Sequence, residues 1–134
     1  MKIEIWKGND SKVYANIGPY AMNAKVVSEI EGYPILTDEN YIWFVVFDGK
    51  EIIGFSALKL SQQSAEFTND YVSPEYRKKG VHSKLIKERL SWCKENGIKY
   101  AKADCTNVCI DQYIKAGFKV SKSFVKWHKV ERDV

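Results

Sequence analysis

The chain has 134 residues, of which 45% are hydrophobic and 28% are charged, and its formal net charge is +4. This length suits a single domain over residues 1–134, and no apolar run reaches the ~20 residues of a membrane-spanning helix, so we expect no membrane partner. Three cysteines are an odd number for a disulfide framework. Because no histidine lies near Cys105 or Cys109 in the sequence, we predict no metal site. The first residues lack the apolar segment of a signal peptide, which favours a cytoplasmic location.

Charge is unevenly distributed along the chain. Residues 1–60 hold 6 Lys or Arg and 8 Asp or Glu, whereas residues 61–134 hold 15 and 9. The first part is therefore slightly acidic and the second part is clearly basic. A basic half of this kind fits a polyanionic ligand, either a nucleotide-like cofactor or nucleic acid.

The first 40 residues predict one strand and two helices. Alternating apolar residues favour a strand over 2–7, and a helix starts near a capping residue, either Asp10 or Ser11. The pair Gly18-Pro19 should interrupt this helix. A second helix is expected over 20–30, with its end at Gly32.

The middle of the chain predicts three consecutive antiparallel strands. Residues 41–47 are β-branched or aromatic, and Asp48-Gly49 is a strong hairpin signal. The chain returns over 51–60, turns, and forms a third strand over 65–72.

A basic loop and an amphipathic helix follow the third of these strands. Pro74 ends the strand, and residues 77–80 read Arg-Lys-Lys-Gly. Apolar residues from Leu85 to Cys93 recur at helical spacing. A glycine-bearing loop at a helix start suits phosphate binding, because the first N–H groups of a helix have no internal partner. A loop whose lysines are merely solvated explains the same pattern, and the loop alone does not decide between these alternatives.

The last third of the chain adds one more helix and further strands. We predict a strand over 98–104, a helix over 108–116 capped by Asn107, and an extended segment over 118–130 with a bulge or turn at 121–123. The complete order predicts an α/β (α+β) fold with a mixed central sheet of six to seven strands, antiparallel in its first half, and about four flanking helices.

Two segments of this sequence resemble motifs of the GNAT superfamily of N-acyltransferases. The first, VSPEYRKKGVH at 72–82, is similar to the family segment V-x-P-x-x-R-x-x-G-x-(G/A), with His82 at the last small position. The second, NVCIDQYIKAGF at 107–118, is similar to N-x-x-A-x-x-x-Y-x-x-x-G-F, with Tyr113, Gly117 and Phe118 in register. The resemblance covers roughly residues 51–130 and implies a single GNAT-like domain.

The resemblance implies that the protein binds acetyl-CoA as a co-substrate, with no metal. Backbone groups at the end of the fourth strand would pair with the pantetheine arm, the following loop would wrap the pyrophosphate, and an asparagine would lie beside the thioester. The residues that this implication selects are Tyr71, Val72, Ser73, Arg77, Lys78, Lys79, Gly80, Val81, His82, Ser83 and Asn107. A side chain as large as His82 would crowd the pyrophosphate unless it points outward.

Acyl transfer to an amine needs a proton donor for the leaving thiolate and a means to deprotonate the amine. Tyr113 matches the tyrosine of the family and is the candidate general acid; a core tyrosine is the alternative. The carboxylate position that many members use as a base is Thr68, so Asp70 is the candidate base and Glu66 the next one. Both carboxylates are also explained as exposed strand residues.

The function that we predict is acetyl transfer from acetyl-CoA to an amine by direct attack in a ternary complex. A nucleic-acid-associated protein, or a related enzyme that acts on nucleic acid, is the second hypothesis, although no nucleic-acid motif supports it. A degenerate domain that binds CoA or a partner without turnover is the third. The acceptor is not identified by the sequence, and the protein is expected to be a monomer or a homodimer.

Overall fold

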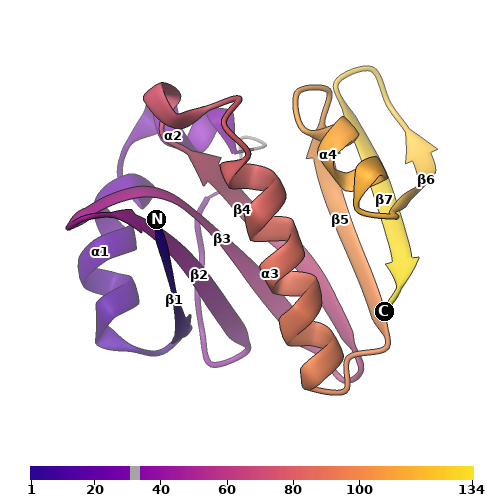
Figure 1. The fold of residues 1–134 in the computed structure, drawn as a ribbon, viewed down its shortest axis with the longest axis horizontal. Helices are drawn as coiled ribbons and strands as arrows, with labels where there is room; N and C mark the ends of the chain where they lie inside the picture. The colour runs from indigo at the N-terminus through magenta and orange to yellow at the C-terminus, as the bar shows by residue number, and fades with distance from the viewer. Residues whose placement is uncertain (31–33) are drawn as a thin grey trace.

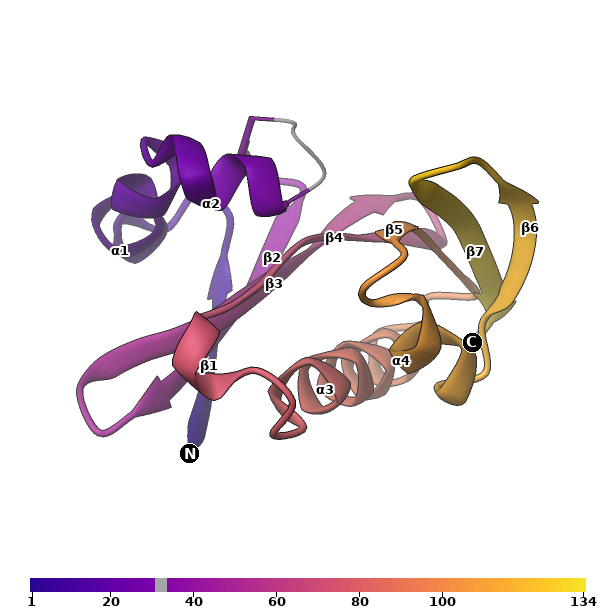
Figure 2. The ribbon, with the colours of Figure 1, turned by 90° about the horizontal axis from the view of Figure 1, so that it is seen from above.

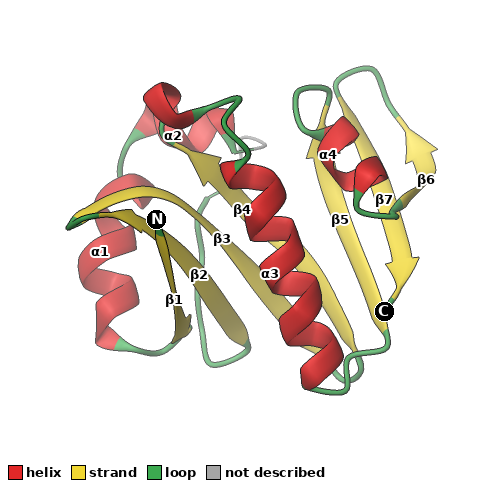
Figure 3. Ribbon diagram, viewed as in Figure 1, coloured by secondary structure: helices red, strands yellow, loops and turns green. Residues whose placement is uncertain are grey.

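Figure 1 shows the fold in a computed structural model, which describes residues 1–30 and 34–134. In chain order the elements are β1 (Lys2–Lys7), α1 (Ser11–Ala21), α2 (Ala24–Glu29), β2 (Tyr41–Asp48), β3 (Glu51–Ser61), β4 (Ser64–Val72), the 3-10 helix η1 (Pro74–Tyr76), α3 (Val81–Glu95), β5 (Tyr100–Thr106), α4 (Ile110–Lys115), β6 (Lys119–Ser123) and β7 (Trp127–Asp133). The strands form one seven-stranded sheet in the order β1-β2-β3-β4-β5-β7-β6. The predicted fold class is confirmed, and Figure 3 separates its helices and strands by colour.

Helices cover both faces of the sheet. Figure 2 shows α1 and α2 on one face and α3 and α4 on the other. Each face has its own core. One core includes Trp43 and Phe55 under α1 and α2, and the other includes Phe67 together with Leu85 and Ile86 of α3.

The three-strand meander is confirmed. β2 pairs with β3 and β3 pairs with β4, both antiparallel, and β1 adds an antiparallel edge beside β2. The crossover through α3 then makes β5 parallel to β4. This single parallel pair joins the meander to the antiparallel strands β5, β7 and β6.

The early helices differ from the prediction. α1 continues through Gly18 and Pro19 to Ala21, so the predicted interruption was wrong. Pro19 lies in the last turn, where its missing N–H costs one bond near the helix end, and packing of Val13 and Ile17 in the core holds the helix. The second helix is shorter than predicted, and its predicted stop at Gly32 lies outside the described residues.

The end of the chain forms two strands and not one extended segment. The irregularity expected at 121–123 is a register shift between Val120 and Lys122, and the chain then reverses after Ser123. Among the described residues, no helix has the length and apolar character that crossing a membrane requires.

Candidate active site

β4 and β5 run together only over the first part of their length. Ser64–Phe67 pairs with Tyr100–Ala103, and the pairing register ends there. Figure 1 shows the two strands diverging beyond this point, with α3 and α4 on either side of the opening. The end of β4 therefore has backbone groups that β5 does not pair.

A bulge at Asn69 sets the direction of the side chains at the opening. Ser56 of β3 lies opposite both Asn69 and Asp70, and Asn69 has a left-handed backbone with φ 57°. One extra residue shifts the alternation of a strand, so Phe67 and Asp70 face the same side of the sheet. Without the bulge, Asp70 would point away from α3.

Asp70 is the centre of a polar cluster on the α3 side. Nη1 of Arg89 lies 2.8 Å from Oδ1 of Asp70, and Nε2 of His82 lies 2.8 Å from Oδ2. The Tyr113 hydroxyl donates a hydrogen bond to the same Oδ2. The His82 and Tyr113 rings meet edge to face, with centroids 5.6 Å apart. The cluster thus joins β4, α3 and α4 at the divergence of the strands.

Arg89 is fully buried, at 0% exposure, and its guanidinium is fixed from several directions. Its Nε donates to the Leu85 carbonyl at 3.2 Å, and its Nη1 donates to the Ala57 carbonyl at 3.3 Å. The centroid of the Phe67 ring lies 4.5 Å from the guanidinium carbon of Arg89. A buried cation with these partners provides a permanent positive charge beside Asp70.

This arrangement shifts the pKa values of Asp70 and Tyr113 in opposite directions. Burial opposes ionisation of Asp70, but the Arg89 charge and the contacts with His82 and Tyr113 outweigh it, so the pKa of Asp70 lies well below its ordinary value. Burial, followed by the Asp70 charge, raises the pKa of Tyr113 well above its ordinary value. Asp70 is therefore a carboxylate and a weak proton acceptor, and Tyr113 holds its proton tightly.

The loop between β4 and α3 has the backbone expected of a tight helix entry. Gly80 caps α3 with a left-handed φ of 84°, and an added Cβ would meet no atom within 4 Å. The bond from the Lys84 N–H to the Gly80 carbonyl, at 3.0 Å, closes the first turn. The N–H groups of residues 81–83 precede that bond and have no acceptor within the helix.

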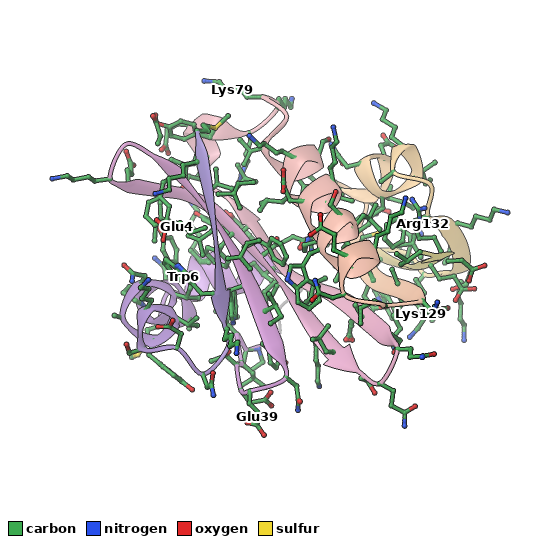
Figure 4. All side chains as sticks on the ribbon, turned by 60° about the horizontal axis from the view of Figure 1, so that its bottom comes forward. Glu4, Trp6, Glu39, Lys79, Lys129 and Arg132 are labelled. Atoms are coloured by element: carbon green, nitrogen blue, oxygen red, sulfur yellow. The ribbon has the colours of Figure 1, made fainter. Side chains whose placement is uncertain are left out.

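The side chains of this loop point in different directions. Arg77 donates to the Val72 carbonyl at 2.9 Å and pairs with Glu29 of α2, so its guanidinium faces α2. Lys79 lies at the outer rim of the molecule in Figure 4, with its Nζ 5.7 Å from the Tyr76 ring centroid. His82 turns inward to Asp70, so the alternative in which its side chain points outward does not hold.

The side chain of Asn107 forms its hydrogen bonds with residues outside the Asp70 cluster. Its amide donates to the Val125 carbonyl at 3.0 Å, and its Oδ1 lies 2.6 Å from Nε2 of His128. It does not cap α4, because the capping residue is Cys109. Counted back from Tyr113, the asparagine of the family motif falls on Thr106, at the end of β5. The contact between Asn107 and a thioester stays a prediction.

A hollow of about 290 Å³ opens on the other face of β4. Its lining includes Glu66, Thr68, Asn69 and Asp104, together with Leu36 and Tyr41. Glu66 and Thr68 alternate with Phe67, so they face away from the Asp70 cluster. The two candidate bases of the sequence thus lie on opposite faces of the sheet.

Sequence reasoning missed Arg89 and the inward direction of His82. The signal was present in the helix period, because Leu85, Ile86, Arg89 and Cys93 share one stripe of α3. A charged residue on a buried stripe requires an opposite charge nearby. Asp70 can be identified as this opposite charge only if the bulge at Asn69, which turns Asp70 toward α3, is known.

A family model places the chain among known enzymes. The acetyltransferase (GNAT) family model matches residues 13–118, so the chain belongs to this family. The family and the class of enzyme that the two motifs implied are confirmed. No curated protein sequence gives a significant match.

Several solved structures share the fold. Escherichia coli ElaA has a TM-score of 0.79 at 14% identity, over 98% of this chain and 99% of that one. The ribosomal-protein-S18-alanine N-acetyltransferase of Escherichia coli has a TM-score of 0.75 at 13% identity, over 99% and 94%. The PaiA N-acetyltransferase of Thermoplasma acidophilum, solved with coenzyme A, has a TM-score of 0.68 at 23% identity, over 100% of both chains. Because the sequence identities are this low, the similarity to these structures shows a shared fold and nothing more.

Proposed function

We propose that the protein transfers an acetyl group from acetyl-CoA to an amine by direct attack in a ternary complex. The divergence of β4 from β5 beside the Gly80 loop carries this proposal. An unpaired strand edge accepts an extended amide-containing arm as an added strand, and the free N–H groups at the start of α3 suit a pyrophosphate. The neighbour solved with coenzyme A supports the choice of cofactor.

The cofactor residues follow from this placement. Tyr71, Val72 and Ser73 would pair with pantetheine through their backbones, and the segment 77–83 would wrap the pyrophosphate. We give Arg77 a structural task, because its guanidinium ties the end of β4 to Glu29. Lys78 and Lys79 are exposed and would add positive charge near the phosphates.

Tyr113 and Asp70 take different tasks in the transfer. We propose that the Tyr113 hydroxyl, whose one hydrogen is donated to Asp70 in this structure, turns to the departing CoA sulfur in the transition state, because its proton is retained at neutral pH. Asp70 positions the Tyr113 hydroxyl and the His82 ring, because a carboxylate with a depressed pKa abstracts protons poorly. The acceptor amine then reaches the thioester in its neutral form, from the hollow beside Thr68.

Turnover with a panel of amines tests the proposal. The purified protein is incubated with acetyl-CoA and with primary amines, amino acids or peptides, and the released CoA thiol is measured. The expected result is amine-dependent thiol release, with the acetylated acceptor visible by mass spectrometry. Binding of acetyl-CoA without release for any acceptor would favour a binding domain, and absence of binding would contradict the proposed cofactor.

A further inference from the structure

Two of the three cysteines lie beside the Asp70 cluster. Cys105 is in the last part of β5 and is 1% exposed. Cys109 follows a turn in which its N–H donates to the Thr106 carbonyl at 3.2 Å, and it precedes the first residue of α4. Unlike Cys105, Cys109 is partly exposed. Both residues pack in the core of the α3 side.

The side chains of these cysteines are in contact. The Cys109 thiol forms a hydrogen bond with the Cys105 side chain, and its Sγ lies 3.4 Å from Oγ1 of Thr106. Charged and titratable groups face Cys109 from three other elements, namely Asp70 of β4, His82 of α3 and Tyr113 of α4. The accessible thiol therefore has a second thiol within reach.

The surroundings of Cys109 favour its thiolate. The hydrogen bond with Cys105 acts most strongly and lowers the pKa of Cys109 to about 6, although burial opposes it. A hydrogen bond with Thr106 and the charge of His82 act in the same direction, and the Asp70 charge acts against them. Burial instead raises the pKa of Cys93 to about 11. Only a thiolate attacks a disulfide, and the opposite pKa shifts of Cys109 and Cys93 distinguish the two thiols in this respect.

We propose that Cys109 is a thiol oxidation site that reacts with small-molecule disulfides and that Cys105 resolves the adduct. The Cys109 thiolate attacks one sulfur of a disulfide RSSR, forms a mixed disulfide and releases RS⁻. The Cys105 thiol then loses its proton, attacks Sγ of Cys109 and releases the second RS⁻. In sum, two protein thiols lose two electrons and two protons, and RSSR becomes two RSH. An accessible, acidic cysteine next to a buried second cysteine is the arrangement that this sequence of steps requires.

A disulfide between Cys105 and Cys109 would affect the Asp70 cluster through α4. It would tie the residue that precedes α4 to the end of β5, and Tyr113 lies one turn further along the same helix. Oxidation would also remove the Cys109 thiolate, whose charge contributes to the raised pKa of Tyr113. The disulfide would thus fix one side of the Asp70 cluster. This inference concerns the thiols alone and does not depend on the proposed cofactor.

Oxidised glutathione provides the test on the full chain. The reduced protein is incubated with it at pH 7, quenched with acid, alkylated after unfolding and digested with trypsin. Both cysteines fall in one peptide, residues 103–115, whereas Cys93 falls in another, residues 90–94. We expect peptide 103–115 to lose two hydrogens and to resist alkylation, while Cys93 is alkylated in full. A reducing agent should restore both thiols.

Cysteine-to-serine variants separate the two steps. Cys105→Ser should accumulate the glutathione adduct on Cys109, and Cys109→Ser should remain reduced over the same time. A wild-type protein that stops at the adduct, or a Cys109 that reacts no faster than Cys93, would overturn the proposal. If a variant fails to fold, alkylation of the native wild-type chain still decides the matter. Cys109 should react with iodoacetamide at pH 6.5, and a rate that falls tenfold between pH 8 and 6.5 would contradict an acidic thiol.

Discussion

The two faces of the sheet are stabilised in different ways. Under α1 and α2 the core contains aromatic pairs, such as Tyr20 with Phe55 at 5.1 Å between centroids and Trp43 with Phe55 at 5.9 Å. Under α3 and α4 an apolar core surrounds the ion pair of Arg89 and Asp70. The first face depends on buried area, which is insensitive to pH. The second face depends on each member of the polar cluster keeping its partners.

This difference indicates where the fold serves stability and where it serves a site. An apolar core would stabilise the α3 side at least as well as a buried ion pair does. The α3 side instead retains a carboxylate, a guanidinium, an imidazole and a phenol at the opening between β4 and β5. Perturbed acidities gathered at such an opening are typical of functional sites.

Removing the buried cation should have the largest effect on stability. Arg89→Met keeps most of the volume but leaves Asp70 without its main counter-charge, so we expect the free energy of unfolding at pH 7 to fall by about 3–5 kcal/mol. Urea denaturation measures it. Lys87→Met, on the exposed side of the same helix, is the matched control and should change the value by less than about 0.5 kcal/mol. Equal stability of Arg89→Met and the wild type would show that the ion pair is not important.

The pH dependence of stability should distinguish the two faces. The pKa of folded Asp70 is lowered from its ordinary value of 3.8, so its contribution to stability is present above that value and is lost as the pH falls toward the folded pKa. We expect Asp70→Asn to reduce the free energy of unfolding by about 1.5–3 kcal/mol at pH 7. The difference in the free energy of unfolding between Asp70→Asn and the wild type should shrink below pH 4.

Phe55→Ala, on the aromatic face, is the control for this comparison. It should destabilise by about 3–5 kcal/mol through the loss of buried aromatic area, by a similar amount at every pH where the protein folds. A deficit of Asp70→Asn that stays constant from pH 7 to pH 3 would contradict the assigned acidity of Asp70.

Tyr113→Phe should have the smallest effect on stability and a larger one on turnover. The variant loses one hydroxyl, so about 1 kcal/mol of unfolding free energy is expected to disappear. Loss of the hydrogen bond to the departing sulfur in the transition state should lower kcat by roughly 100-fold or more, with acetyl-CoA affinity nearly unchanged. Steady-state kinetics measure both quantities. Wild-type turnover in this variant would remove Tyr113 from the mechanism.

Local sequence signals predicted the elements that local chemistry controls. The hairpin at Asp48-Gly49 and the helix entry at Gly80 depend on backbone conformations that the sequence shows directly. The positions of Tyr113 and of the loop followed from two family motifs. Their roles in catalysis and binding remain proposals.

Features that depend on tertiary contacts were harder to predict. The direction of His82 and the burial of Arg89 both depend on Asp70, which the bulge at Asn69 turns toward α3. No sequence period identifies a bulge of this kind. Asn107 does not cap α4, because Cys109 takes that position, and the asparagine of the family motif aligns with Thr106 when it is counted back from Tyr113. Pro19 does not break α1, because packing of the helix outweighs the local effect of the proline.

Calorimetric titration with acetyl-CoA tests the central claim most directly. Gly80→Glu adds bulk and negative charge at the start of α3, whereas Gly97→Glu makes the same change at the far end of α3, with a similar positive φ and similar open space. The account predicts that the wild type and Gly97→Glu bind acetyl-CoA alike and that Gly80→Glu loses at least tenfold in affinity. Unchanged binding by folded Gly80→Glu would contradict the loop as the pyrophosphate site. No binding by the wild type would favour the hypothesis of a nucleic-acid or partner-binding protein.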